Sequence, residues 1–587
     1  MTNALHVSQK ESMLRLAAAS PRVSPCDIEA NTKAIIEAIK QADDARADYL
    51  ALPELCLTGA TLGALYEYDA VLKAASDALL VICKAVRHTE VTVCVGLPYM
   101  ISGKVQSCAA LLRGERVYAI LPLKQNRAPF GFSSALYAQH TTTLTPLRNL
   151  EITGCGAVFE GAEAAAGNVM LVQSCANATA SSLRKTREAL RSCSARTGTA
   201  LAYAAPNGGE SGTSFVFDAY CAIAAGGEIL AESVMEDSPF IYADVDTASL
   251  CAFEPFIRVT RQTSYLPEDE ELAREDCLRI LELQAAALVR RITHIRGKGF
   301  VIGVSGGLDS ALTILAAARA AQRLGWKNES VSGISMPGFG SSKRTRGNAK
   351  LLVEALGCKY REIDITASCR RHFEDIGHDE NDRSVVYENA QARERTQILL
   401  DISNKEGLLD VGTGDLSEAA LGWTTFGGDH LAQYGVNASL PKTVIRKVVA
   451  AAKDIFPSAA AVLQDILDTP VSPELLPADQ KGEISQKTEE LIGSYELHDL
   501  FIYEMVVNKK SPKDVFEAAC DKTDFPREEI YRVLGVFLKR FFAQQFKRCC
   551  APEAPDILVS IAPVVFPFPS DMYADAFIRE YEEIKLD

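Results

Sequence analysis

The sequence has no apolar run near the ~18 residues that a membrane-spanning helix needs, so we expect no membrane partner. Its 16 cysteines form neither a C-x-x-C pair nor a cysteine–histidine cluster at zinc spacing, which argues against a zinc module and favours reduced thiols in the cytoplasm. Positive charge is scarce, because 61 lysines and arginines stand against 76 acidic residues and leave a net charge of −15. We therefore expect no nucleic-acid partner, although a local basic pocket for a phosphorylated substrate is compatible with this balance. The first 22 residues lack a signal-peptide pattern, and no internal repeat is evident.

The composition is that of a globular protein, with 48% hydrophobic and 23% charged residues. A chain of 587 residues is too long for one core. We expect a first domain over residues 1–262, a linker over 263–275 and a second domain over 276–587. Mixed charge and proline around residues 253–271 suggest the linker, and a helix is expected from about Ala273 to Arg296.

One stretch predicts an anion site. Residues 300–304 form a β-branched apolar run, Gly306 and Gly307 follow, and a helix-forming segment begins at about Leu308. Two glycines allow a tight turn that aims backbone N–H groups at the helix N-terminus, where the helix dipole favours a phosphate. The stretch carries neither the Gly-Lys-Ser/Thr of a Walker A loop nor a dinucleotide GxGxxG.

This stretch resembles the pyrophosphate-binding loop of ATP pyrophosphatases, which cleave ATP between its α and β phosphates. The resemblance implies that ATP is a co-substrate that adenylates its partner. It places ATP contacts at Gly303, Val304, Ser305, Gly306, Gly307, Leu308, Asp309 and Ser310. Beyond the loop, strands at 330–336 and 360–363 alternate with helices, which predicts a doubly wound parallel sheet with ligands at its carboxyl edge.

Further segments of the second half, taken together with the loop, resemble the NAD+ synthetase family. They are residues 387–395, 411–418, 421–430, 437–443, 472–477 and 495–499. The resemblance implies that ATP adenylates the nicotinate carboxylate of nicotinic acid adenine dinucleotide, and that ammonia then displaces AMP to give NAD+. An alternative is that the loop serves another adenylating amidotransferase, of the GMP-synthetase or asparagine-synthetase kind.

Adenylating a carboxylate brings two anions together, so cations must dominate such a site. Asp309 and Glu418 are oxygen donors suited to Mg²⁺. Arg395 and Lys442 can neutralise phosphate oxygens, and Thr413 can hydrogen-bond the nucleotide. The residues expected to bind the dinucleotide are Asn389, Glu418, Trp423, Thr424, Thr425, Phe426, Asp429, Lys442 and Lys547.

In the first half two sets of strands alternate with helices, which is the pattern of an α/β or an α-β-β-α layered domain, and we expect the α-β-β-α sandwich. Residues 52–59, 95–98, 203–207 and 226–232 resemble the nitrilase superfamily, in which a glutamate is general base, a lysine stabilises the oxyanion and a cysteine attacks an amide. Glu54 stands at the position of the base. With the second half, this implies that glutamine supplies the ammonia and that the chain forms homo-oligomers.

The other two catalytic positions depart from the nitrilase pattern. The family has lysine directly after a proline, whereas here Leu123 intervenes between Pro122 and Lys124, and neighbouring strand residues point to opposite faces. Cys155 is the better positional match for the nucleophile, and Cys175 is the alternative. The catalytic set expected from the resemblance is therefore Glu54, Lys124 and Cys155. The other hypothesis is that the nitrilase-like domain is an inactive scaffold and that free ammonia is the nitrogen donor.

Overall fold

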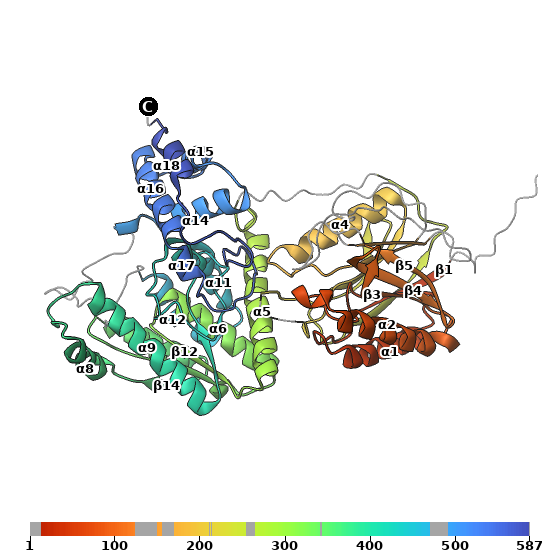
Figure 1. Cartoon of the computed structure of the whole chain (residues 1–587), viewed down its shortest axis with the longest axis horizontal. Coiled ribbons are helices and arrows are strands. Elements are labelled where there is room, and N and C mark those ends of the chain that lie inside the picture. The colour runs from red at the N-terminus through yellow and green to blue at the C-terminus, as the bar shows by residue number, and fades with distance from the viewer. Residues whose placement is uncertain are drawn as a thin grey trace, which may run out of the picture. The chain divides into compact units, whose positions relative to one another are not determined.

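The structure is a computed structural model that describes residues 13–123, 150–154, 169–210, 212, 214–253, 264–340, 343–469 and 491–585. Contacts divide the chain into two compact units (Figure 1). The first comprises Met1–Ser211 with Phe215–Val259, and the second comprises Gly212–Ser214 with Thr260–Asp587. No helix within the described ranges is long and apolar enough to cross a membrane.

The first unit contains two β-sheets. One has the strand order β11-β1-β2-β3-β4-β5 and the other β10-β9-β8-β7-β6. The first sheet consists of β1 (Met13–Ala19), β2 (Tyr49–Ala51), β3 (Thr92–Ile101), β4 (Lys104–Arg113), β5 (Arg116–Pro122) and β11 (Phe240–Asp246). The second consists of β6 (Leu150–Gly154), β7 (Val169–Gln173), β8 (Ala200–Ala204), β9 (Cys221–Ala225) and β10 (Glu228–Ser233).

Strand β1 illustrates how the layers of this unit form. Its side chains alternate, so that Leu16 and Ala18 face a core shared with the second sheet, whereas Ala17 and Ala19 face the core beneath the helices. Helices α1 (Ile28–Asp44) and α2 (Asp69–Ala85) cover the outer face of the first sheet, and α4 (Ser182–Thr197) covers that of the second. The α-β-β-α sandwich predicted from the sequence is confirmed.

The second unit is built on a parallel sheet with the order β14-β13-β12-β15-β16. Its strands are β12 (Phe300–Gly303), β13 (Val331–Ser335), β14 (Lys359–Glu362), β15 (Leu409–Gly412) and β16 (Tyr434–Gly435). Helices α6 (Leu308–Arg323) and α7 (Lys343–Ala355) cover one face, and α8 (Thr366–Ile376) and α9 (Val385–Glu406) cover the other. The expected doubly wound sheet is confirmed.

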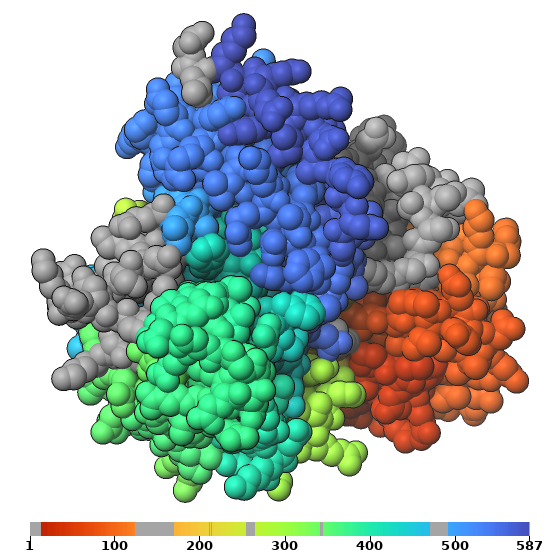
Figure 2. All heavy atoms as spheres, turned by 60° about the vertical axis from the view of Figure 1, so that its left-hand side comes forward, coloured from red at the N-terminus to blue at the C-terminus, as the bar shows by residue number. Residues whose placement is uncertain are grey.

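Further helices complete this unit. Around the sheet lie α10 (Leu416–Leu421), α11 (Lys442–Ala452) and α12 (Ala460–Leu467). The C-terminal helices α14 (Tyr495–Ile502), α15 (Pro512–Lys522), α16 (Arg527–Ala543) and α18 (Asp575–Glu582) share a core with α10. The short helix α17 (Gln545–Arg548) follows α16. In the space-filling view, the green segment with α8 and α9 and the blue C-terminal segment form adjoining parts of one face of this unit (Figure 2).

Helix α5 (Glu270–Ile295) begins inside the stretch expected to be a linker, three residues before the helix start expected at Ala273. Asp269 caps it by accepting hydrogen bonds from the backbone nitrogens of Glu271 and Leu272 at 3.1 Å each. Acidic residues stabilise the positive end of a helix dipole. The acidic run is therefore a helix start, and α5 extends into the stretch expected to be a linker.

Candidate active site

The order of the strands creates a binding crevice. From the central strand β12 the chain winds outward through β13 and β14, then returns to pair β15 with the opposite edge of β12. Parallel sheets bind ligands where the winding direction reverses, at the carboxyl ends of the strands. The loops after β12 and β15 therefore both open into the same crevice.

The loop after β12 has the geometry of an anion cradle. Gly306 has φ of +85°, and a Cβ atom there would lie 2.0 Å from the carbonyl oxygen of Thr345, so only glycine fits. The Ser305 hydroxyl accepts a hydrogen bond from the Gly307 nitrogen at 3.1 Å, and the Ser310 hydroxyl donates to the Gly307 carbonyl oxygen at 3.1 Å. Gly307 caps α6, whose positive end faces the crevice.

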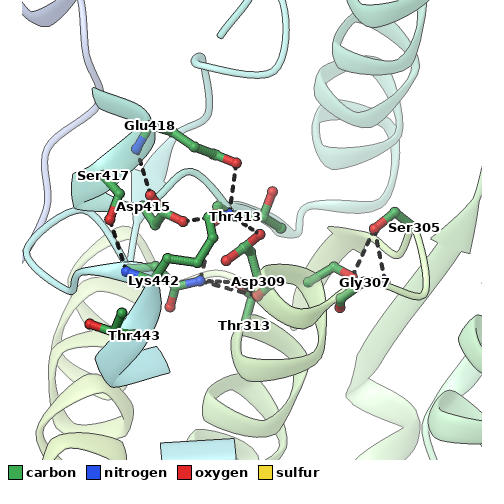
Figure 3. Close-up of polar contacts among 12 residues, drawn as sticks. Ser305, Gly307, Asp309, Thr313, Thr413, Asp415, Ser417, Glu418, Lys442 and Thr443 are labelled. Atoms are coloured by element: carbon green, nitrogen blue, oxygen red, sulfur yellow. Dashed lines mark hydrogen bonds and ion pairs between the residues drawn. The ribbon is translucent and has the colours of Figure 1, made fainter. Parts of the chain in front are cut away.

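A buried cluster of charges lies beside this loop (Figure 3). The ammonium of Lys442 is 2.9 Å from Asp309 Oδ2, 2.8 Å from Asp415 Oδ2 and 3.0 Å from Glu418 Oε1. Only 5% of the Lys442 side chain is exposed. One ammonium among three carboxylates leaves an excess of negative charge when all are ionised, and buried charge of this kind is costly without a counter-ion.

The donor set of this cluster suits a divalent cation. Oxygens of Asp309, Asp415 and Glu418 all lie within 4.8 Å of one another. The second oxygen of Asp309, Oδ1, is buried and has no hydrogen-bond partner among the residues that the structure describes. Hard cations such as Mg²⁺ prefer carboxylate oxygens. The residues present therefore fit a magnesium ion, and they include Asp415, which the sequence reasoning did not single out.

Asp415 could not be singled out from the sequence because it also matches an ordinary helix N-cap. The residue caps α10, where its Oδ1 accepts a hydrogen bond from the Glu418 nitrogen at 2.7 Å, and aspartate is common at that position in any helix. Burial raises the pKa of Asp415 and raises the pKa of Glu418 to about 7. Burial by itself lowers the pKa of the Lys442 ammonium. The three carboxylates outweigh burial and raise that pKa above its ordinary value.

The crevice opens into a cavity of about 770 Å³. Every ATP-binding and dinucleotide-binding residue predicted from the sequence lines it, from the loop at 303–310 to Lys547. Trp423 and Phe426, expected to form an aromatic wall, both line the cavity. The ring centres of Phe426 and Phe546 are 5.7 Å apart, and the Arg540 guanidinium lies 5.0 Å from the Trp423 ring centre. The structure thus brings these residues together, while their individual roles stay predictions.

Several of these side chains hold the cavity wall itself. The Lys547 ammonium donates to the carbonyl oxygens of Gly422 and Thr424 at 2.7 Å each. Asp429 Oδ1 accepts from the Thr425 nitrogen at 2.7 Å. Arg395 Nε donates to the carbonyl oxygen of Met336 at 3.0 Å. Polar groups near the cavity therefore fix the wall in one conformation.

Asp499 of α14 hydrogen-bonds to the chain segments that carry Glu418 and Lys442. Its Oδ2 accepts from the nitrogen of Thr443 at 2.9 Å and from the Thr443 hydroxyl at 2.7 Å, and its Oδ1 accepts from the Ser417 hydroxyl. The Ser417 hydroxyl in turn accepts from the Lys442 nitrogen at 2.9 Å. Burial raises the pKa of Asp499 to about 6. Ser417 and Thr443 adjoin Glu418 and Lys442 in the chain, so Asp499 holds both ends of that ion pair.

The first unit contains the glutamate expected as a base. Glu54 is only 4% exposed, and its Oε1 accepts a hydrogen bond from the Ser107 hydroxyl at 2.6 Å. Its loop lies close against β3, because a Cβ atom on Gly96 would approach the Leu55 nitrogen to 2.4 Å. Cys175 is half-buried beside the core that includes Tyr66. Lys124 and Cys155 lie outside the described residues, so the catalytic set of this unit stays a prediction.

Comparison with known proteins bears on both units. A family model described as NAD synthase matches residues 280–550. An NH(3)-dependent NAD(+) synthetase from Hyperthermus butylicus is 32% identical over 260 residues, which cover 83% of that protein and 44% of this chain. The chain belongs to the NAD(+) synthetase family. The family resemblance predicted from the sequence is confirmed.

Similarity to larger proteins of this family extends over nearly the whole chain. A glutamine-dependent NAD(+) synthetase from Mycobacterium leprae is 28% identical over an alignment that covers 98% of both chains. The crystal structure of a glutamine-dependent NAD(+) synthetase from Cytophaga hutchinsonii superimposes with a TM-score of 0.78 and 19% sequence identity, and covers 97% of this chain and 100% of that one. At that identity the likeness establishes the fold, which has the two-unit architecture expected from the sequence.

Proposed function

We propose that this chain is a glutamine-dependent NAD+ synthetase. ATP adenylates the nicotinate carboxylate of nicotinic acid adenine dinucleotide with release of pyrophosphate, and ammonia released from glutamine displaces AMP. The observation that carries the proposal is the buried Lys442 with three carboxylates beside the loop at the start of α6. The full-length similarity to glutamine-dependent members of the family supports glutamine as the donor.

In this mechanism the second unit positions two anions and stabilises the charge that moves to pyrophosphate. Backbone N–H groups of residues 305–308 and the dipole of α6 bind the phosphates of ATP. Asp309, Asp415 and Glu418 would hold Mg²⁺, which when bound neutralises phosphate oxygens. Lys442 keeps these carboxylates together in the absence of substrate and supplies a positive charge to the α-phosphate.

The remaining cavity residues have proposed roles in binding. Arg395 and Thr413 bind the nucleotide. The wall at 423–426, with Asn389, Asp429 and Lys547, binds the dinucleotide, with Lys547 acting through the carbonyls that it holds. Water must be excluded from the adenylated carboxylate, because hydrolysis there would waste ATP. The aromatic rings of Trp423 and Phe426 can provide that shielding.

In the first unit, Glu54 would act as general base, Lys124 as oxyanion stabiliser and Cys155 as nucleophile, with Cys175 the alternative nucleophile. Glu54 is buried, and a carboxylate shielded from water is suited to accept a proton from a thiol. We assign this chemistry to residues 1–262 and the synthetase reaction to 276–587. We further propose a cytoplasmic homo-oligomer, in keeping with free thiols at the described cysteines.

The test is NAD+ formation from nicotinic acid adenine dinucleotide, ATP and Mg²⁺, with glutamine or ammonium chloride as nitrogen donor. We expect turnover with both donors. Glu54→Gln should abolish turnover with glutamine and leave turnover with ammonium intact, whereas Asp309→Asn should abolish both. Turnover of the wild-type chain with ammonium alone would mean that the first unit is a scaffold, and no turnover with either donor would refute the synthetase assignment.

A further inference from the structure

A second acidic side chain lies at the bottom of the cavity, away from the charged cluster. Asp410 of β15 is 2% exposed and lines the cavity. Its backbone nitrogen donates to the Gln433 amide oxygen at 3.0 Å, but its carboxyl group makes no hydrogen bond or ion pair within the described part of the chain. Buried carboxyl groups without a partner are costly and uncommon, and one that faces a ligand cavity indicates a ligand that completes its hydrogen bonds.

The strand register shows which way Asp410 points. Asp410 pairs with Val301 of the neighbouring parallel strand β12, so the two side chains share one face of the sheet. Val301 belongs to the apolar cluster that includes Leu399 of α9. Asp410 therefore lies under α9, among apolar side chains, and not on the α6 side of the sheet.

Two glycines on the same face allow apolar side chains to approach the strand ends closely above Asp410. A Cβ atom on Gly303 would lie 3.0 Å from Leu399 Cδ1, and a Cβ atom on Gly412 would lie 2.8 Å from Ala432 Cβ. Both glycines are the last residues of their strands and line the cavity. Leu399, Ala432 and the two glycines thus form an apolar part of the cavity wall beside the Asp410 carboxyl group. Val301, which pairs with Asp410, lies two residues before Gly303, where the phosphate loop begins.

A planar heteroaromatic ring with an exocyclic amino group suits a cavity wall that is apolar except for one buried carboxyl group. The ring packs against this apolar wall from the cavity side, and the amino group donates to the carboxyl oxygen. We propose that Asp410 is a specificity-determining residue that binds the amino group of the purine base of ATP. This inference rests on the proposed function for the identity of the nucleotide.

The protonation state of Asp410 favours adenine. Adenine presents an amino donor beside the N1 acceptor, and a neutral carboxylic acid, which can accept and donate at once, complements that pair. An ionised carboxylate would instead match two donors, as guanine presents. Burial raises the pKa of Asp410 to about 7, and no neighbouring charge contributes to the change.

Calorimetric titration of the full-length protein tests this assignment without turnover. The probes are α,β-methylene-ATP and its analogue without the 6-amino group. We expect wild-type protein to bind the amino-bearing nucleotide about 10-fold or more tightly, because the analogue leaves the buried carboxyl unpaired. Asp410→Leu should bring the two affinities to within about 3-fold, and Asp410→Asn, which keeps an acceptor and a donor, should preserve the preference. Asp401→Asn, at an exposed position of α9, is the matched control.

An unchanged preference in Asp410→Leu, or no preference in the wild-type protein, would overturn the proposal. If Asp410→Leu does not fold, judged by its thermal transition, Asp410→Ala provides the same comparison. Because binding is measured without turnover, loss of the NAD+ reaction and loss of base recognition give different results. If the protein prefers the amino-bearing nucleotide but forms no NAD+, the proposed function is refuted and the role of Asp410 is not.

Discussion

Replacing Lys442 by methionine would test the charged cluster most directly. The substitution approximately preserves the length of the side chain and removes the ammonium that lies within 3.0 Å of all three carboxylates. Asp415 is fully buried and cannot recover its lost interaction from water. The folded state is then left with uncompensated negative charge in a region of low dielectric constant.

Removing one partner of a buried ion pair typically costs about 3–5 kcal/mol of stability. Protonation of Glu418 or Asp415 would reduce the loss, so we expect about 3 kcal/mol at neutral pH. Lys447 lies on the same helix, α11, and is exposed. The matched variant Lys447→Met should therefore change the free energy of unfolding by no more than about 0.5 kcal/mol.

Tryptophan fluorescence during urea unfolding is a suitable assay. Both tryptophans of the chain, Trp326 and Trp423, lie in the second unit, so the signal reports on that unit alone. Mg²⁺ should raise the unfolding midpoint of Lys442→Met more than that of the wild-type protein, because the variant cluster carries one more uncompensated negative charge. If Lys442→Met unfolds at the same urea concentration as Lys447→Met, with or without Mg²⁺, the described cluster is wrong.

Three further predictions follow from single residues. Asp499→Asn turns one of two acceptor oxygens into a donor, so the hydrogen bonds from Thr443 and from Ser417 cannot both be kept. We therefore expect kcat for NAD+ formation with ammonium to fall about 10-fold or more while the KM for the dinucleotide stays nearly constant; an unchanged kcat would contradict its positioning role. Gly306→Ala forces a Cβ atom to 2.0 Å from the Thr345 oxygen at φ of +85°, and should abolish calorimetric binding of α,β-methylene-ATP, whereas Gly347→Ala, with open space around its Cβ, should not. For Asp410 the pKa is raised on folding from about 3.9 to about 7, so its contribution to stability is complete below about pH 4 and is lost as the pH rises to about 7. Compared with Asp410→Asn, wild-type protein should lose up to about 4 kcal/mol of unfolding free energy over that range, and parallel pH profiles of the two proteins would refute this.

Local chemistry explains what could be predicted from the sequence. The phosphate loop is encoded in consecutive residues, since a buried strand, two glycines and a helix start leave the backbone few alternatives. The same holds for the hairpin between β3 and β4, where Ser102 and Gly103 both have positive φ. Glu54 follows the short apolar strand β2, and the structure buries its side chain.

The sequence by itself thus determined the two-unit architecture, the phosphate loop and the residues that gather around it. Only the tertiary structure decided which role each acidic residue of the second unit has. Asp415 looks like a helix cap, Asp499 like a surface aspartate and Asp410 like an interruption of a strand. The role of each depends on neighbours more than 20 residues away. The order of the parallel strands and the packing of α14 against α10 and α11 bring these neighbours together. Burial, and with it the cost of an unpaired charge, is a property of that packing and has no local signal in the chain.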